Sequence, residues 1–466
     1  MRLRTTDHAN TTSELSRYRL AAVVVAVVAF FFILWVGRDQ YFIFDEWAYW
    51  TTRKQLWDGG SYASYFMEPH VGHWHGLTMA VWRPIEWVFG LRTYLPYLVP
   101  TILVHCLAGI LLFELLVHAR VRFAVALATA TLFLFMGNAA GNVAFAWQIA
   151  FTAPIALTFL TLWALQRFSD GGSAWWGAVV AGGPLIAITA SGVGLTAAIV
   201  AALAAALRRR FLLAAAVVLT SGGAYLIWRQ TFPSGSLGVD LSHAGSYLRY
   251  VAEGFEQTAA DMFQTGIPAL AWVLLAVAVI GTAVAAVDRD PYWSVYFACL
   301  VGAVFFYATL ATQRAGVAQG DPGAFAATSS RYVYISSALL LPSLAYLADR
   351  LLSLRRWIAP VLAACLVWAL VGNARFLVGW NDLHATLGQE VRASVAAAAA
   401  MGPHLDAAAP DLLAFGAASI PLDVETVQEF ARNGMLPCDT SYEEAVELAA
   451  ALQIPTPSPE DLSCDR

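Results

Sequence analysis

The chain has 466 residues, of which 59% are hydrophobic and only 13% are charged, and its mean hydropathy is +0.61. This composition excludes an ordinary soluble globular domain and predicts an integral membrane protein. The net charge of −5 is unevenly divided, because residues 376–466 carry fourteen Asp and Glu against three Arg. No basic stripe typical of nucleic-acid binding is present, so we expect no nucleic-acid partner.

Apolar runs that are long enough, or nearly so, to cross a bilayer follow one another along the chain. They cover residues 19–37, 96–117, 121–137, 142–166, 174–189, 191–207, 211–229, 266–287, 291–312, 331–349 and 355–375. The first run has no small-residue cleavage site behind it, so we expect it to be retained as a helix. Glycine and proline at 182–184 indicate either a tight hairpin or one broken helix between 174 and 207.

Arginine positions orient these predicted helices. Arginines precede the first run and then occupy every second connection, at 120 and 122, 167, 208–210, 289, and 350, 355 and 356. The positive-inside rule places these connections in the cytoplasm. The sequence therefore predicts an all-α polytopic membrane protein with about eleven transmembrane helices and a cytoplasmic N-terminus.

Two domains are predicted from this layout. Residues 1–375 form a transmembrane domain with a long first outer loop at 38–95, in which an apolar stretch at 77–91 is too short to span and is typical of an interfacial amphipathic helix. Residues 376–466 form an acidic, helical, extracytoplasmic tail. In that tail Ser441 and Glu444 have the spacing of a capping box. Cys438 and Cys464 are a candidate disulfide if the tail lies outside, and whether they pair is left open.

Two adjacent carboxylates, Asp45 and Glu46, follow the first helix and are embedded in aromatic residues. Charge placed beside so much apolar surface is costly and tends to be functional. Desolvation brings a carboxylate pKa closer to the value that a general base needs, and aromatic neighbours can stack on sugar rings. The alternative is an ordinary interfacial aromatic belt with two solvated acids.

A second polar stretch in the same loop combines Glu68 with His70, His73 and His75. Histidine and glutamate at this density are able to bind a divalent metal or to hydrogen-bond a phosphate. Neighbouring glycines favour a loop that approaches a ligand, and a plain solvated loop is the third interpretation. We expect this stretch to line a substrate site, with no metal or other cofactor required; a divalent metal stays open.

Arginines also mark the outer ends of two late helices, Arg314 before the loop 313–330 and Arg331 after it, next to Tyr332. A guanidinium at headgroup depth pairs well with a phosphate, while snorkelling to lipid headgroups is the alternative. Weaker candidates for the site are Arg249 with Glu253, and Trp147 with Gln148, whereas Glu114 is interpreted as structural.

Taken together, these features resemble the GT-C superfamily of integral membrane glycosyltransferases, which includes protein mannosyltransferases and the bacterial aminoarabinose and arabinofuranosyl transferases. The resemblance rests on the Asp45–Glu46 pair, the long first outer loop, the stretch ending in His73, Trp74 and His75, the run at 90–97, and Ser330, Arg331 and Tyr332 opening a late helix. The His-Pro-Pro-Leu sequence frequent in the mannosyltransferases is replaced here by His73-Trp74-His75-Gly76.

The resemblance implies sugar transfer from a polyprenyl-phosphate donor to an extracytoplasmic glycan, lipid or protein acceptor, with inversion at the anomeric carbon. Asp45 is the implied base and Glu46 its alternate, while Arg314 and Arg331 are the implied phosphate partners. The sequence contains no glycine-rich phosphate loop for a nucleotide sugar. Two other classes remain as alternatives, a transporter or flippase of a lipid-linked glycan and a non-catalytic membrane anchor.

Overall fold

The computed structural model describes residues 5–70, 72–233, 241–264, 268–318, 326–401, 424–437 and 439–452, together with 456, 458 and 462. Over this part of the chain every regular element is helical, and the only β-type pairing is an isolated bridge between His70 and His73. The predicted all-α class is therefore confirmed.

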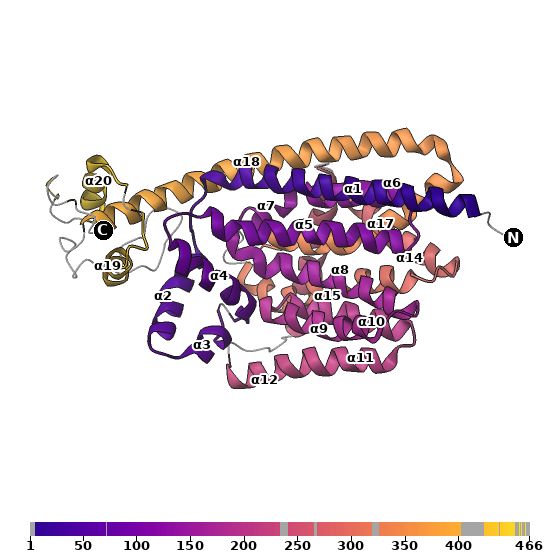
Figure 1. The fold of residues 1–466 in the computed structure, drawn as a ribbon, viewed down its shortest axis with the longest axis horizontal. Helices are drawn as coiled ribbons and strands as arrows, with labels where there is room; N and C mark the ends of the chain where they lie inside the picture. Colours follow the sequence, from indigo (N-terminus) through magenta and orange to yellow (C-terminus); the bar gives the residue numbers. More distant parts are fainter. Residues whose placement is uncertain are drawn as a thin grey trace.

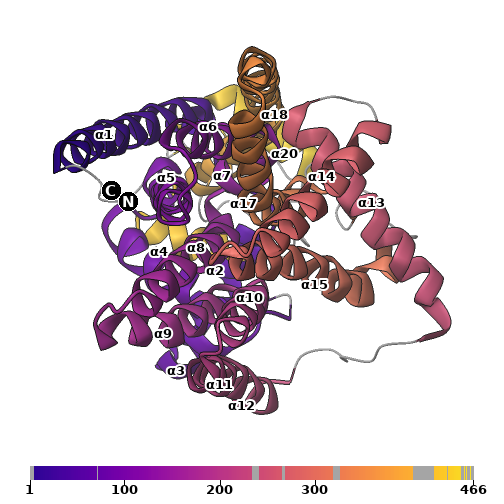
Figure 2. The same ribbon diagram turned by 90° about the vertical axis from the view of Figure 1, so that its right-hand side faces the viewer.

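Long helices lie side by side along the longest axis of the molecule (Figure 1). The apolar ones are α1 (Thr5–Val36), α5 (Leu95–His118), α6 (Phe123–Leu134), α8 (Ile149–Ser169), α9 (Ala174–Ala190), α10 (Gly194–Leu207), α11 (Phe211–Val217), α12 (Gly223–Thr231), α14 (Pro268–Val287), α15 (Trp293–Ala318), α17 (Ser330–Leu354) and α18 (Ala359–Met401). Figure 2 looks along the bundle, with α5, α8 and α17 in its middle and α1 and α18 at its border.

Seven helical segments in the described part of the chain are long and apolar enough to cross a membrane, and a bent pair, Phe123–Leu134 with Gly137–Val143, raises the number to eight. Three further apolar helices, Ala174–Ala190, Gly194–Leu207 and Trp272–Val287, are shorter. The chain is therefore an integral membrane protein. The described residues of each of the eleven predicted runs are mainly helical, while the number of spans and the orientation remain predictions.

The uncertain stretch between 174 and 207 forms two helices, α9 and α10. Ser191 separates them in an extended conformation (φ −175°, ψ 175°), and its hydroxyl donates to the Ala150 carbonyl of α8 at 2.7 Å. The hairpin alternative therefore describes this segment.

Small residues let the helices approach closely, as is usual in membranes. The buried side of α10 carries Ala197, Ala201 and Ala204. On the neighbouring α15, a methyl group at Gly302 would lie only 2.3 Å from a Val200 methyl. Close backbone packing, and not aqueous hydrophobic burial alone, therefore holds this part of the bundle.

The arginine-bearing connections meet at one end of the bundle, which we call the basic end and define by Arg19, Arg122, Arg208 and Arg350. Arg122 pairs with Asp349 at 2.7 Å and Arg350 with Asp288 at 3.1 Å, so connections far apart in sequence are joined here. Three of the turns place an arginine in the left-handed region directly after a helix, at Arg120 (φ 62°), Arg209 (φ 59°) and Arg289 (φ 55°). A cation at a helix C-terminus interacts favourably with the helix dipole, which offsets part of that strain.

The first outer loop folds into α2 (Asp45–Asp58), α3 (Tyr62–Met67) and α4 (Gly76–Phe89) at the opposite end of the molecule (Figure 1). Helix α4 covers the predicted amphipathic stretch: Met79 and Trp82 are buried, whereas Trp87 is 83% exposed. Helix α13 (Ala244–Phe263) packs against α14, α15 and α17.

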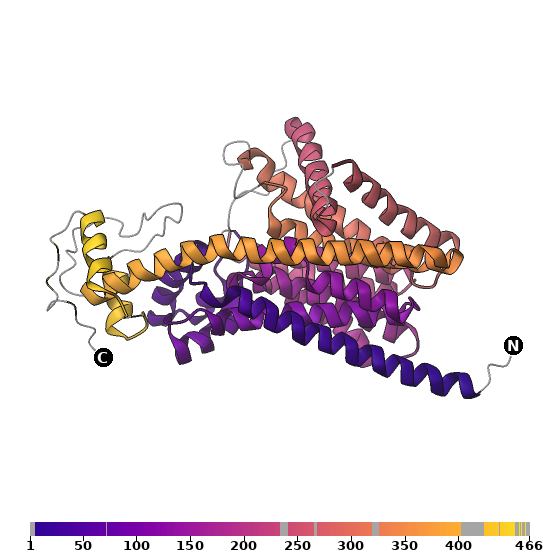
Figure 3. The ribbon, with the colours of Figure 1, turned by 90° about the horizontal axis from the view of Figure 1, so that it is seen from above.

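The last apolar helix, α18, continues without a break from Ala359 to Met401, across the predicted domain boundary at 375 (Figure 3). Its far end packs against α19 (Val424–Arg432) and α20 (Tyr442–Leu452). The predicted capping box is confirmed, because Ser441 N–H donates to Glu444 Oε2 at 2.7 Å and Glu444 N–H donates to Ser441 Oγ at 3.2 Å. Cys438 and Cys464 lie outside the described residues.

Candidate active site

A cavity of about 700 Å³ lies at the end of the bundle opposite the basic end. Helix α15 connects the two ends of the bundle, because it starts beside Arg208 at the basic end and reaches the cavity at Arg314. Polar residues of the wall come from the first outer loop, from the segments around η3 and between α9 and α10, and from α10, α12, α15, α17 and α18. They are His70, His73, His75, Trp147, Gln148, Ser191, Thr196, Tyr225, Thr309, Gln313, Arg314, Ser329, Ser330, Arg331, Tyr332, Trp380 and His384. Six of the predicted site residues, His70, His73, His75, Arg314, Arg331 and Tyr332, thus share one cavity.

The histidine stretch is a tight turn whose shape is fixed by its own backbone. His70 and His73 exchange both N–H···O bonds, at 2.9 and 3.0 Å, and Gly72 between them adopts φ +78°, which favours glycine. The His70 and His75 rings lie 4.9 and 5.0 Å from the Trp147 ring. Trp147, a weaker candidate in the sequence, therefore packs against these histidines and lines the cavity with them.

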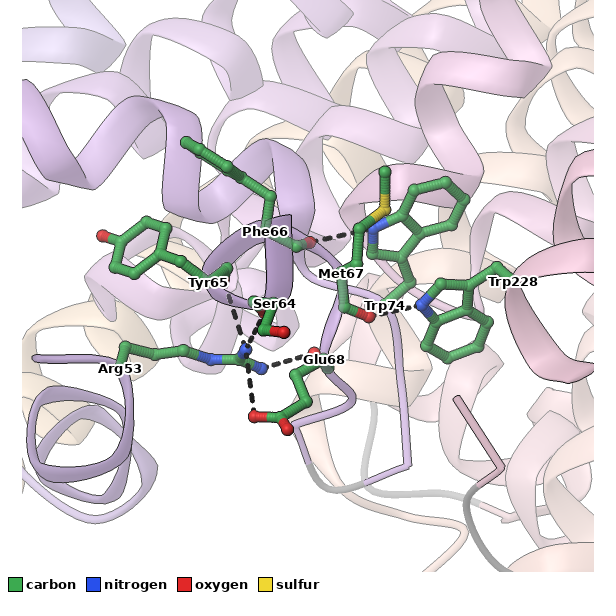
Figure 4. A network of polar contacts seen from close by, with 8 residues as sticks. All are labelled: Arg53, Ser64, Tyr65, Phe66, Met67, Glu68, Trp74 and Trp228. Carbon is green, nitrogen blue, oxygen red and sulfur yellow. Dashed lines mark hydrogen bonds and ion pairs between the residues drawn. The ribbon is translucent and has the colours of Figure 1, made fainter. Parts of the chain in front are cut away.

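A buried arginine holds the segment that leads into this turn (Figure 4). Arg53 donates from Nη1 to the Ser64 and Tyr65 carbonyls at 3.0 and 3.2 Å, and from Nη2 to the Glu68 carbonyl. It thereby satisfies carbonyls at the C-terminal end of α3. Burial lowers the pKa of the Arg53 guanidinium from its usual value. Glu68 serves this network, with its carboxylate 3.9 Å from Arg53 Nη1, and is not part of the cavity wall.

Two tryptophans attach the same segment to α12 (Figure 4). Trp74 Nε1 donates to the Phe66 carbonyl at 3.0 Å, and Trp228 Nε1 donates to the Met67 carbonyl at 2.5 Å. Their rings stack with centroids 5.6 Å apart and planes 6° from parallel. This attachment positions His73 close to Gly192, just before α10. A methyl group at Gly192 would lie only 2.9 Å from His73 Nδ1.

His73 is buried in the neighbourhood of several arginines. Burial first, and then the positive charges of Arg314 and Arg331 with further effects of His70 and Arg229, lower the pKa of His73 to about 4. Burial also holds the pKa of His75 well below its usual value. Both imidazoles are therefore neutral near pH 7, and the arginines supply the positive charge. Arg229 at the end of α12 was not predicted from the sequence.

The two adjacent carboxylates have different places. Glu46 is fully buried and accepts hydrogen bonds from Ile43 N–H at 3.0 Å, Tyr94 hydroxyl at 2.9 Å and Trp147 N–H at 3.2 Å. It joins the starts of α2 and α5 to the short helix η3 (Ala146–Gln148) and is not part of the cavity wall. Asp45 is the first residue of α2, and its side chain lies outside the described residues.

The residue before Asp45 has a strained backbone. Phe44 adopts φ 51° and ψ −125°, a region that bulky residues rarely occupy, and its ring lines the cavity. The backbone of Asp45 therefore begins α2 directly beside the cavity wall.

Helix α18 adds Trp380 and His384 to the wall, which were not predicted as site residues. They lie beyond residue 375, where the sequence was assigned to the tail. Their i, i+4 spacing, which places two rings on one helix face, was the signal available in the sequence.

Within the described part of the chain, no group of three His, Cys, Asp or Glu side chains is placed to hold one metal ion. The other weak candidates lie elsewhere: Arg249 and Glu253 form an i, i+4 pair at 2.8 Å with Arg249 82% exposed. Glu114 pairs with Arg19 through two hydrogen bonds of 2.7 and 2.8 Å near the basic end, as its structural interpretation predicts.

No protein-family model matches the chain, and no curated protein matches its sequence. Among solved structures, the chain is similar to the crystal structure of ArnT from Cupriavidus metallidurans bound to undecaprenyl phosphate, with a TM-score of 0.49 and 14% identity over 95% of this chain and 88% of ArnT. For ArnT in the apo state the TM-score is 0.38 and the identity 15%, over 96% of this chain and 90% of ArnT.

Proposed function

We propose that the protein is a membrane glycosyltransferase that transfers a sugar from a polyprenyl-phosphate donor to an acceptor outside the cytoplasm, with inversion at the anomeric carbon. The observation that carries the proposal is the composition of one cavity wall. Arg314 and Arg331 line it with His70, His73 and His75, and apolar side chains of α8, α10 and α15 line the same cavity. This combination suits a ligand with an anionic head and a hydrocarbon chain.

The arginines are the proposed phosphate partners. A guanidinium offers a planar pair of donors that matches two phosphate oxygens. Burial first, and then the charges of Arg314 and Arg331, lower the pKa of the neighbouring His73. The neutral histidines are able to donate a further hydrogen bond to phosphate or sugar without adding charge.

Asp45 is the proposed general base. The three hydrogen bonds of Glu46 support this choice, because they commit the second carboxylate to joining α2, α5 and η3. In the proposed step the acceptor hydroxyl attacks the anomeric carbon and gives its proton to the Asp45 carboxylate. The bond from that carbon to the phosphate oxygen breaks, and Arg314 and Arg331 stabilise the charge on the departing polyprenyl phosphate.

A transporter or flippase is the second candidate class, and it would be expected to carry charged groups along a path near the midplane. The arginines and histidines of the described cavity wall gather instead at one end of the bundle. This arrangement supports the enzyme over the transporter.

The test is a transfer assay in membranes that contain radiolabelled polyprenyl-phosphate sugars. Asp45→Asn should lower turnover by roughly a hundredfold or more while donor binding stays nearly intact, because the amide keeps the shape but accepts no proton. Arg331→Ala should weaken donor binding, and Arg331→Lys should restore only part of it because the planar fork is lost. Arg122→Ala at the basic end is the matched control. Wild-type turnover by Asp45→Asn would remove that residue as the base.

A further inference from the structure

The part of α18 that extends beyond residue 375 brings an aromatic pair to the cavity. Trp380 and His384, one helical turn apart, both line its wall. Their rings stack with centroids 3.5 Å apart and planes 15° from parallel. The proposed phosphate site and base involve other residues, so this pair has no role in the function proposed above.

Contacts with the segment before α2 fix the position of the pair. Asn381, next to Trp380, accepts a hydrogen bond from Gln40 at 2.6 Å between two buried side chains. One turn beyond His384, a methyl group at Gly388 would lie only 2.7 Å from the Tyr41 nitrogen. Helix α18 thus packs closely against the segment that contains Gln40 and Tyr41 and leads to Phe44 and Asp45.

The chemistry of the pair is set by a hydrogen bond within the helix. His384 Nδ1 lies 3.1 Å from the Trp380 carbonyl oxygen, which only accepts, so Nδ1 carries the proton. In the neutral ring Nε2 is then the unprotonated nitrogen and accepts a hydrogen bond. The wall therefore offers a flat indole surface beside a hydrogen-bond acceptor.

We propose that Trp380 and His384 form the acceptor subsite and that the acceptor is a carbohydrate. A sugar ring presents an apolar C–H face that packs on an indole and hydroxyl groups that donate to imidazole. A hydrocarbon chain would also pack on Trp380 but gives no partner to Nε2, which is why the sugar is favoured over the lipid tail. The inference rests on the proposed transferase function, for which it names the acceptor class.

The experiment measures binding to the purified full-length chain in a polyoxyethylene detergent, which has no sugar headgroup to compete. The probes are octyl glycosides of glucose, mannose, galactose and arabinose, with undecaprenyl phosphate measured separately. Trp380→Leu removes the flat ring, and His384→Phe keeps an aromatic ring but removes Nε2. Trp368→Leu is the matched control, because Trp368 lies on the same helix, 68% exposed and outside the cavity wall.

We expect Trp380→Leu and His384→Phe each to weaken binding of the glycoside that the wild type prefers by about tenfold or more. Undecaprenyl phosphate should bind all variants within about twofold of the wild type, and Trp368→Leu should bind both probes normally. Glycoside binding within twofold of wild type in both cavity variants, or no glycoside binding by the wild type, overturns the subsite.

The two proposals fail in different ways. Loss of undecaprenyl phosphate binding in parallel with glycoside binding would place the pair on the lipid path and overturn the acceptor subsite, while the donor assignment stands. A wild type that binds a glycoside through the pair but does not bind undecaprenyl phosphate would support the subsite and contradict the proposed donor.

Discussion

The two ends of the bundle use arginine in different surroundings. At the basic end, each of three arginines faces a carboxylate of another helix: Arg19 with Glu114, Arg122 with Asp349, and Arg350 with Asp288, at 2.7 to 3.1 Å. At the cavity end, Arg314 and Arg331 share a wall with four histidines, and no Asp or Glu is among the described residues of that wall.

This difference distinguishes arginines that pair with acids of the protein from arginines that line the cavity. The three arginines of the basic end form ion pairs with acids of the protein. At the cavity, Arg314 and Arg331 add to the effect of burial in lowering the pKa of His73. The comparison is consistent with the proposal that the cavity arginines are phosphate partners and that the arginines of the basic end have a structural role.

The strongest test of the comparison uses one carboxylate from each end. Glu46→Ala removes a buried acceptor and leaves the donors of Ile43, Tyr94 and Trp147 without it, so we expect a loss of about 4 kcal/mol or more. Glu114→Ala removes a partly exposed ion pair with Arg19 and should cost about 1 kcal/mol or less. Thermal unfolding of the purified variants measures both. Equal losses would contradict the structural role of Glu46.

The next test uses Arg53, an arginine at the cavity end that donates hydrogen bonds to backbone carbonyls. Arg53→Met keeps much of the buried volume but leaves the carbonyls at the end of α3 without their donor, which should cost about 3 kcal/mol. The histidine turn should then lose its position, and undecaprenyl phosphate should bind at least tenfold more weakly. Arg350→Met, an exposed pair at the basic end, is the control. Unchanged binding of undecaprenyl phosphate by Arg53→Met would show that the hydrogen bonds of Arg53 do not position the ligand-binding residues.

The lowered pKa of His73, which is caused first by burial and then by the nearby arginines, makes stability depend on pH. The pKa of His73 is about 4 in the folded protein against an unperturbed 6.5, so between these values only the unfolded chain binds the proton. Stability is fully present above pH 6.5 and should fall as the pH drops from 6.5 to 4, by at most about 3 kcal/mol for this group. His73→Gln should flatten the decline in unfolding temperature, and Arg314→Gln should flatten part of it because the His73 pKa rises. The same slope in wild type and His73→Gln would contradict the assignment.

Much of this architecture was predictable from the sequence. Hydropathy alone places the eleven apolar runs in helical structure, because a lipid solvent leaves helices as the way to satisfy the backbone of such runs. Of the residues expected to line one cavity, Asp45, His70, His73 and Arg331, the last three do so, and the side chain of Asp45 lies outside the described residues. Helix ends and loops at the same end of a bundle are close neighbours. The order of helices along the chain was therefore enough to predict that these residues lie near one another.

The remainder depends on packing that sequence patterns do not encode. The burial of Glu46 depends on where α2 begins, since successive residues of a helix point about 100° apart. The extension of α18 past residue 375 depends on contacts with Gln40 and Tyr41, more than three hundred residues away in the sequence. Hydropathy falls along this segment, so the boundary was drawn too early to include Trp380 and His384 in the site.

The smallest expected effect on stability concerns α20, which lies beyond the cavity end. A substitution in this helix tests whether the functional region extends to the C-terminal helices. Ser441→Ala removes the hydroxyl that caps Glu444 N–H at 3.2 Å and should cost about 1 kcal/mol of local stability. The pKa of Glu444 is held below its usual value mainly by the hydrogen bond from the Ser441 backbone, which the substitution leaves in place, so the box is only half lost.

Hydrogen exchange of amides in α20 should become about fivefold faster in Ser441→Ala, since exchange follows the local opening free energy. Ser394→Ala, which removes a hydroxyl bonded within α18 at 2.9 Å, should leave exchange in α20 unchanged. Undecaprenyl phosphate and glycosides should bind Ser441→Ala as they bind the wild type, because α20 contributes no described residue to the cavity wall. Weaker binding of either probe would mean that α20 acts on the cavity through α18, against which it packs, and would extend the functional end of the molecule to the C-terminal helices.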